Sequence, residues 1–184
     1  MTAKKHGPWT IHGSELKYRH ELMKIYEDEV TRPNGEPGVY AFASIKPGVA
    51  VLAIDEENFV YLVREFRYAV GRESVEVVGG AIDEGEEASD AARRELKEEL
   101  GIEAKELTPL GRVDPITSII DSPSNLFLAR GLTFGETDRE GGESISTVKL
   151  KLEEAARRAL TGEITHGASC VLILRAREYL SEKS

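Results

Sequence analysis

Short apolar runs separated by turn-forming residues fill the first half of the chain, and this pattern is typical of β-strands. Asn34-Gly35 and Lys46-Pro47-Gly48 mark two of the turns, because asparagine, glycine and proline set turn geometry. The segment up to about residue 38 is polar, so we expect it to be irregular apart from one strand. The pattern predicts strands at residues 22–30, 39–45, 49–54, 59–68 and 74–78.

From residue 86 to residue 100 the apolar positions follow a helical period. They recur at steps of three and four residues and form one stripe, which consists of Ala88, Ala91, Ala92, Leu96 and Leu100. Asp83 followed by Glu86 resembles a capping box, which predicts a helix start at this point. Gly101 is typical of a helix end.

The second half of the chain adds further strands and two helices. Strands are predicted at residues 107–113, 125–130 and 146–152, and helices at residues 153–160 and 168–180. Strands therefore come before and after the first helix, and two helices close the chain. This order favours an α+β fold, built as a layered α/β/α sandwich with a mixed sheet, over a repeating βαβ series.

Length and composition indicate a globular protein. The 184 residues suit one domain with a small appendage. No apolar run reaches the roughly 18–20 residues of a membrane span, and the N-terminus does not resemble a signal peptide. The single cysteine, Cys170, excludes an internal disulfide, and the net charge of −9 disfavours nucleic-acid binding, which needs a basic surface. We therefore expect a cytoplasmic protein with no nucleic-acid or membrane partner.

Acidic residues concentrate around the first predicted helix. Nine acidic and three basic side chains lie between Asp83 and Glu103. Glu95, Glu98 and Glu99 are spaced i, i+3 and i+4, so their carboxylates share one side of the helix. The preceding loop, residues 79–85, has three glycines that let the backbone approach a bound group. Such an arrangement suits Mg²⁺, with Mn²⁺ as an alternative, and a solvated acidic helix is the simpler interpretation.

The spacing of these residues resembles one known family. Gly80 is followed after five residues by Glu86 and, after seven more, by the run Arg94-Glu95-Leu96-Lys97-Glu98-Glu99-Leu100-Gly101-Ile102. This sequence resembles the Nudix box, G-x5-E-x7-R-E-U-x-E-E-x-G-U with U an aliphatic residue, at every fixed position. Residues 9–180 are similar to the layout of Nudix hydrolases. The resemblance implies the Nudix fold and Mg²⁺-dependent cleavage of the diphosphate bond in a nucleoside diphosphate linked to another group.

The resemblance also implies roles for the residues of the box. Glu95 and Glu99 are expected to be the main metal ligands, with help from Glu98 and from the backbone carbonyl of Gly79. Arg94 is expected to hold these carboxylates in place through charge-assisted hydrogen bonds.

Two further segments resemble the ADP-ribose pyrophosphatase branch of this family. Glu65-Phe66-Arg67 stands where that branch has a Q-Y-R-like triplet, and Glu76-Val77-Val78-Gly79-Gly80 stands where it has an E-L-P-A-G-like segment. By this resemblance Arg67 contacts a phosphate or the nucleotide, and Glu76 helps to place the ribose or the base. The alternative for Arg67 is a salt bridge with Glu65 or Glu76 at the end of the strand.

The N-terminal segment resembles the same branch, in which it forms a small β-subdomain that crosses to a partner subunit. We therefore expect a homodimer in which residues 1–45 are a dimerisation subdomain and residues 46–184 are the Nudix hydrolase domain. Trp9 and Tyr18 either stack on an adenine bound by the neighbouring subunit or pack within the chain, and we favour packing.

The general base is expected on a polar, glycine-containing loop after the box, at residues 135–144. By resemblance Glu143 fits the position of the base best, just before the strand that begins near Ile145, and Glu140 is second. The alternative for each of them is a solvated charge without a role.

The segment that follows the helix departs from the ADP-ribose branch. Pro115 matches the first proline of its P-x-P-G-x-x-x-E pattern, but the remainder of residues 115–123 does not match. ADP-ribose, cleaved to AMP and ribose 5-phosphate, is the expected substrate, and another nucleotide sugar such as GDP-mannose is the alternative. A non-catalytic nucleotide sensor is disfavoured because the box is whole. His166 has no metal spacing and Ser169 has no His-Asp partners, so neither is assigned a role.

Overall fold

The computed structural model describes residues 3–137 and 145–183, and the chain divides into two compact units. The first unit is Met1–Lys46 together with Asp114–Ser122, and the second is Pro47–Val113 together with Pro123–Ser184. The sequence does not anticipate that Asp114–Ser122, far along the chain, joins the first unit.

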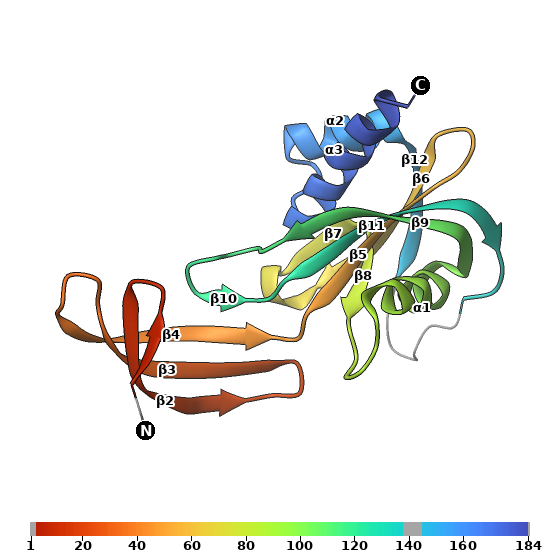
Figure 1. Ribbon diagram of the computed structural model, residues 1–184. Coiled ribbons are helices and arrows are strands. Elements are labelled where there is room, and N and C mark those ends of the chain that lie inside the picture. The colour runs from red at the N-terminus through yellow and green to blue at the C-terminus, as the bar shows by residue number, and fades with distance from the viewer. Residues whose placement is uncertain (1–2, 138–144, 184) are drawn as a thin grey trace. The chain divides into compact units, whose positions relative to one another are not determined.

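The first unit is a sheet with the strand order β1-β2-β3-β4-β10. Neighbouring strands are antiparallel except β10, which runs parallel to β4. The strands are β1 (Lys4–His6), β2 (Trp9–Arg19), β3 (Met23–Thr31), β4 (Pro37–Ile45) and β10 (Ile120–Asp121) (Figure 1).

The expectation of an irregular N-terminal segment is wrong, because β1 and β2 both precede the predicted strand. All positions of β2 are exposed or half-buried, so polar side chains are tolerated on both faces and the alternation that reveals a strand is weak. Trp9 packs edge-on against Tyr40 of the same unit, with ring centroids 5.4 Å apart, and Tyr18 is exposed. Packing within the chain therefore accounts for Trp9.

The second unit is built on a mixed sheet with the strand order β12-β6-β5-β11-β9, to which β7 adds beside β6 and β8 beside β5. β5 and β11 are parallel, and the other pairs are antiparallel. The strands are β5 (Gly48–Ile54), β6 (Phe59–Arg67), β7 (Arg72–Glu76), β8 (Val78–Ala81), β9 (Ile102–Val113), β11 (Ser124–Phe134) and β12 (Ser146–Lys151).

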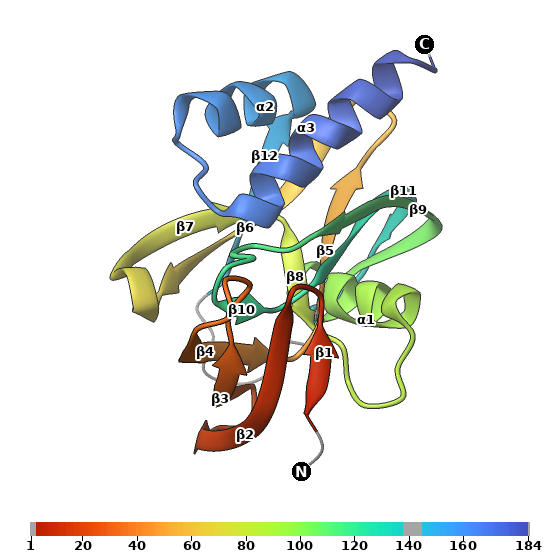
Figure 2. The same ribbon diagram turned by 60° about the vertical axis from the view of Figure 1, so that its left-hand side comes forward.

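Helices cover both faces of this sheet. α1 (Ala88–Leu100) lies on one face, and α2 (Leu152–Thr161) and α3 (Gly167–Ser181) lie on the other (Figures 1 and 2). Alternate residues of β5 enter two separate cores: Leu52 packs with residues of α2 and α3, whereas Val51 packs with residues of α1. A strand that is buried on both faces reads as a continuous apolar run, and the α/β/α sandwich predicted from the order of elements is confirmed.

The first helix begins and ends close to the predicted positions. Its apolar stripe is buried, and Gly101 ends it with a φ of +65°, a conformation that glycine adopts easily. The expected capping box is wrong, since the helix starts at Ala88 after Glu87, which makes no side-chain cap. The carboxylate of Glu86 instead accepts the N–H of Asp83 at 3.0 Å in the turn before the helix.

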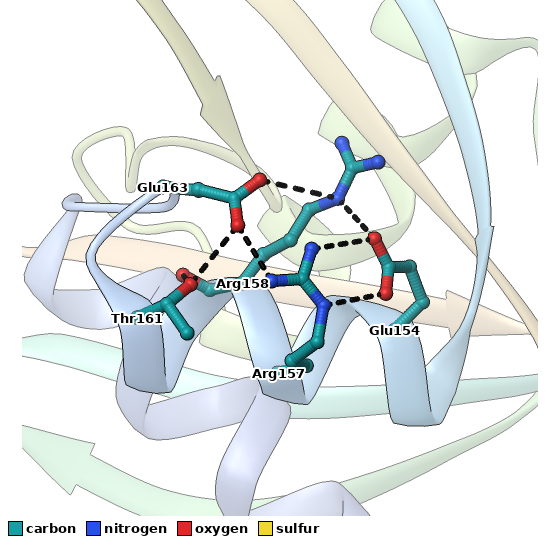
Figure 3. Close-up of polar contacts among 5 residues, drawn as sticks. All are labelled: Glu154, Arg157, Arg158, Thr161 and Glu163. Atoms are coloured by element: carbon teal, nitrogen blue, oxygen red, sulfur yellow. Dashed lines mark hydrogen bonds and ion pairs between the residues drawn. The ribbon is translucent and has the colours of Figure 1, made fainter.

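A network of ion pairs holds the end of α2 to the connection that follows it (Figure 3). Arg157 bridges Glu154 at 2.8 Å and Glu163 at 2.6 Å, and Arg158 contacts Glu154 at 2.7 Å. The two arginines lower the pKa of Glu154 to about 2. Exposed ion pairs add little to stability, so the effect of this network is mainly to orient the connection between α2 and α3.

Candidate active site

β8 brings its backbone directly against the carboxylate of Glu95. A Cβ atom on Gly80 would lie 2.1 Å from Oε1 of Glu95, a distance that real Cβ atoms essentially never show. The side chain of Glu95 is only 12% exposed. Glycine at position 80 therefore makes room for a nearly buried carboxylate beside the strand. Gly79 is tight for a different reason, because a Cβ there would lie 2.7 Å from the backbone oxygen of Val49 on β5.

Arg94 connects three of the carboxylates around α1. Its Nε and Nη2 donate to the two oxygens of Glu86 at 2.9 and 3.0 Å, and Nη2 also donates to the backbone oxygen of Ala81 at 3.0 Å. Its Nη1 donates to Glu95 at 2.6 Å and to Glu98 at 3.2 Å. One guanidinium thus ties the helix to the end of β8 and to the turn before the helix, with charge-assisted hydrogen bonds.

The carboxylates of Glu86 and Glu95 have opposite pKa shifts. The hydrogen bonds from Arg94 lower the pKa of Glu86. Burial raises the pKa of Glu95, and this effect exceeds the opposing attraction of Arg94, while the charges of Glu98 and Glu86 raise it further. A carboxylate of this kind is the one that gains most from an additional cation.

Glu98 and Glu99 complete the acidic side of the helix. The side chain of Glu98 is 40% exposed, whereas the Oε2 atom of Glu99 is buried. Glu99 lies close enough to Arg67 for its charge to raise the pKa of that guanidinium, together with Glu76 and Glu65 and against the effect of burial. The acidic side of α1 therefore continues toward Arg67.

The donor set fits a hard divalent cation by its chemistry. Three glutamates on one helix, together with the backbone carbonyls of β8, offer only oxygen atoms, which such cations prefer. Across residues 3–137 and 145–183, however, no three His, Cys, Asp or Glu side chains converge as a ready metal site. Because Arg94 already contacts Glu95 and Glu98, these carboxylates must exchange part of that contact for a cation.

A second polar cluster surrounds Arg67 at the end of β6. Its Nε and Nη2 donate to Glu76 at 3.3 and 2.9 Å, and its Nη1 lies 2.7 Å from Glu65. Glu76 is buried, yet the hydrogen bonds from Arg67 bring its pKa below the usual value, because they outweigh the effect of burial. The salt bridge named as the alternative for Arg67 is present with both partners. Its side chain is still 40% exposed.

Two residues that the sequence interpretation set aside belong to the same cluster. Nδ1 of His166 lies 2.8 Å from Oγ of Ser169 and 3.5 Å from Oε2 of Glu76. Ser169 is fully buried and accepts the backbone N–H of Val77 at 2.9 Å. The only sequence signal is the i, i+3 spacing of His166 and Ser169 at a helix start, and their partner Glu76 lies 90 positions away in the chain.

The two candidates for the general base, Glu140 and Glu143, lie outside the described residues. The described part of the chain has no helix long and apolar enough to cross a membrane.

Comparison with known proteins identifies similar sequences. A family model described as the NUDIX domain matches residues 44–155. An ADP-ribose pyrophosphatase of Bacillus subtilis (strain 168) is 31% identical over 152 residues, which cover 82% of this chain and 82% of that protein. The ADP compounds hydrolase NudE of Escherichia coli (strain K12) is 32% identical over 146 residues, which cover 78% of this chain and 70% of that protein.

A solved structure is similar over nearly the whole chain. A crystal structure described as an ADP compounds hydrolase superimposes with a TM-score of 0.83 and 25% sequence identity, and covers 98% of both chains. The fold therefore matches a known architecture.

Proposed function

The chain belongs to the Nudix family and is a pyrophosphohydrolase, and we propose that it hydrolyses ADP-ribose to AMP and ribose 5-phosphate with Mg²⁺. The observation that carries the proposal is the nearly buried carboxylate of Glu95, seated against Gly80 on the same side of α1 as Glu98 and Glu99. The printed names of the Bacillus and Escherichia relatives, which act on ADP-ribose and ADP compounds, support the choice of substrate.

Enzymes of this family generally use divalent metal ions, and we propose Mg²⁺ for this chain. Glu95, Glu98 and Glu99 would hold it, with the backbone carbonyl of Gly79. When bound, Mg²⁺ supplies positive charge for the diphosphate and lowers the pKa of the attacking water. Arg94 keeps the carboxylates facing the site through its bidentate contact with Glu86, even when Glu95 and Glu98 turn away from it.

The reaction exchanges one phosphorus–oxygen bond for another. A water oxygen attacks one phosphorus of the diphosphate, and the bond from that phosphorus to the bridging oxygen breaks. The bridging oxygen leaves with the electron pair of that bond as part of the second phosphate. A glutamate of the loop before β12 accepts the proton of the water, and we propose Glu143 for this role, with Glu140 as the second candidate.

Arg67 and Glu76 are proposed to bind the substrate. Three nitrogens of Arg67 each contact a carboxylate oxygen of Glu65 or Glu76. Each Nη atom carries a second N–H, so the half-exposed guanidinium retains donors for a phosphate oxygen. The contact with Glu76 fixes the plane of the guanidinium, which limits the entropy lost on binding.

A nucleotide sugar such as GDP-mannose is the second candidate substrate. It is favoured by the segment that carries β10, because this segment departs from the ADP-ribose pattern and is held in the first unit by pairing with β4. A site that lacks the expected contacts to the terminal ribose would accept a different sugar.

The test is hydrolysis of ADP-ribose, GDP-mannose, NADH and a dinucleoside polyphosphate with and without Mg²⁺, with the products separated by chromatography. AMP and ribose 5-phosphate released from ADP-ribose at the highest kcat/KM would support the proposal. A preference for GDP-mannose would move the substrate and keep the site, whereas tight binding without turnover of any compound would favour a nucleotide sensor.

We also propose that the protein is a homodimer formed through its N-terminal unit. Sedimentation of the full chain at several concentrations would give the mass of a dimer, and a monomer at micromolar concentrations would contradict this proposal.

A further inference from the structure

The connection between α2 and α3 is held rigidly in front of His166. The backbone N–H groups of Glu163 and Ile164 donate to the oxygen of Arg158 at 2.9 and 3.0 Å. Arg157 binds the side chain of Glu163 at 2.6 Å (Figure 3), and Ile164 is 2% exposed. His166 therefore leaves this connection at a fixed place and in a fixed direction.

The hydrogen-bond acceptors around His166 determine which ring nitrogen carries the proton. Nδ1 faces Oγ of Ser169 at 2.8 Å and Oε2 of Glu76 at 3.5 Å. A carboxylate only accepts, and the Ser169 oxygen has a lone pair left beside the one used by Val77. A proton on Nδ1 satisfies both neighbours. Burial lowers the pKa of His166, against the opposing effect of Glu76, so the neutral ring with Nδ1–H is the relevant form at neutral pH.

Glu76 connects this ring to Arg67. The same Oε2 atom that faces His166 accepts from Nη2 of Arg67 at 2.9 Å. Glu76 is 6% exposed, so its carboxylate rotates little once both partners are in place. If His166 is removed, the carboxylate loses the contact that holds it from the side of α3, and the guanidinium of Arg67 loses the fixed plane that it shares with Glu76.

We propose that His166 is a positioning residue for substrate binding, which acts through Glu76 on Arg67. The inference rests on the proposed function, in which Arg67 contacts the nucleotide. His166 is not part of a nucleophilic triad. Ser169 is fully buried and already accepts the N–H of Val77, and the same ring nitrogen faces both Ser169 and Glu76, whereas a triad uses the two nitrogens separately.

The experiment compares His166→Ala with His166→Asn. The asparagine amide places an N–H donor close to the position of Nδ1, so it restores the contact with Glu76 that alanine lacks. Thr165→Val is the matched control, because Thr165 lies in the same connection and its hydroxyl accepts from Arg72 at 3.0 Å at an exposed position. Melting temperatures of all variants separate loss of fold from loss of positioning.

Binding is measured with the α,β-methylene analogue of ADP-ribose in the presence of Mg²⁺, because its P–CH2–P link is not hydrolysed. For His166→Ala we expect Kd and the KM for ADP-ribose to rise by about fivefold to tenfold, and kcat to change by less than about twofold, since one hydrogen bond to a charged group is lost outside the reacting atoms. His166→Asn and Thr165→Val should both stay within about twofold of the wild type in Kd.

The outcomes separate the two proposals. A wild type that binds the analogue but does not cleave ADP-ribose contradicts the proposed hydrolysis, and the Kd comparison still decides the role of His166. An unchanged Kd in His166→Ala, or an asparagine variant as weak as the alanine variant at an equal melting temperature, overturns the positioning role. A wild type that does not bind the analogue overturns both.

Discussion

The contact between Gly80 and Glu95 gives a direct test of the site. In Gly80→Ala the new Cβ would lie 2.1 Å from Oε1 of Glu95, and since such contacts below 3.0 Å do not occur, the carboxylate must move by at least 0.9 Å. The backbone at Gly80 has no positive φ, so the alanine itself is not strained. The cost is a displaced carboxylate, and a misplacement of about 1 Å in a catalytic group reduces turnover by roughly 10²-fold.

Gly85→Ala is the matched control for this variant. Gly85 lies in the same loop with a φ of +83°, and a Cβ there meets nothing within 4 Å. We therefore expect the control to lose stability through backbone strain, about 1 kcal/mol or roughly 2–4 °C in melting temperature, and to keep its kcat. Gly80→Ala should show the reverse, with a near-normal melting temperature, a kcat lowered by roughly 10²-fold and a weaker response to Mg²⁺. Wild-type turnover in Gly80→Ala would refute the reasoning, because it would mean that Glu95 is not needed where it lies.

Three further predictions concern charge at the same helix. Glu99→Gln should lower kcat for ADP-ribose by several orders of magnitude while its circular dichroism and melting curve stay those of the folded protein; full activity would remove Glu99 from the metal site. Mg²⁺ should raise the melting temperature of the wild type, by about 2.7 kcal/mol in unfolding free energy at 100 times its Kd; a flat response at millimolar Mg²⁺ would contradict a competent site. Because the folded pKa of Glu95 is raised, its stability contribution without metal is present below its unfolded value and is lost as the pH rises through the folded pKa. The difference in melting temperature between wild type and Glu95→Gln, measured against pH in EDTA, should therefore become less favourable to the wild type over that window, and Mg²⁺ should reverse the trend; a difference that does not change with pH would contradict it.

The parts of the fold that the sequence predicts are those whose burial leaves a simple pattern. β5 is apolar at nearly every position because it feeds two cores, and α1 has a stripe that matches its one buried face. β2 is missed because it is nearly all exposed or half-buried, so its side chains carry no periodic signal. β10 is missed because a two-residue strand depends only on its partner β4, which lies more than 70 positions earlier in the chain.

The candidate site divides along the same line. Glu95, Glu98 and Glu99 share a side of one helix, so local spacing is enough to group them. The glycine before them needs a tertiary contact for its explanation, because the proximity of Gly80 and Glu95 arises only when β8 packs beside α1. The cluster of Arg67, Glu76 and His166 joins β6, β7 and the start of α3, and no local pattern links positions so far apart.

Arg94 explains how a cluster of glutamates is stable in a folded chain and still available to a cation. Two of its nitrogens are committed to Glu86, an anchor with a lowered pKa, while only Nη1 serves Glu95 and Glu98. A cation that binds Glu95 and Glu98 therefore displaces one shared nitrogen and leaves the anchor intact. The repulsion among the carboxylates is relieved by Arg94 before binding and by the cation afterwards, so the helix does not have to unfold or rotate between the two states. The same division accounts for the two opposite pKa shifts on one helix and its turn, since Glu86 is satisfied by the protein itself and Glu95 is not.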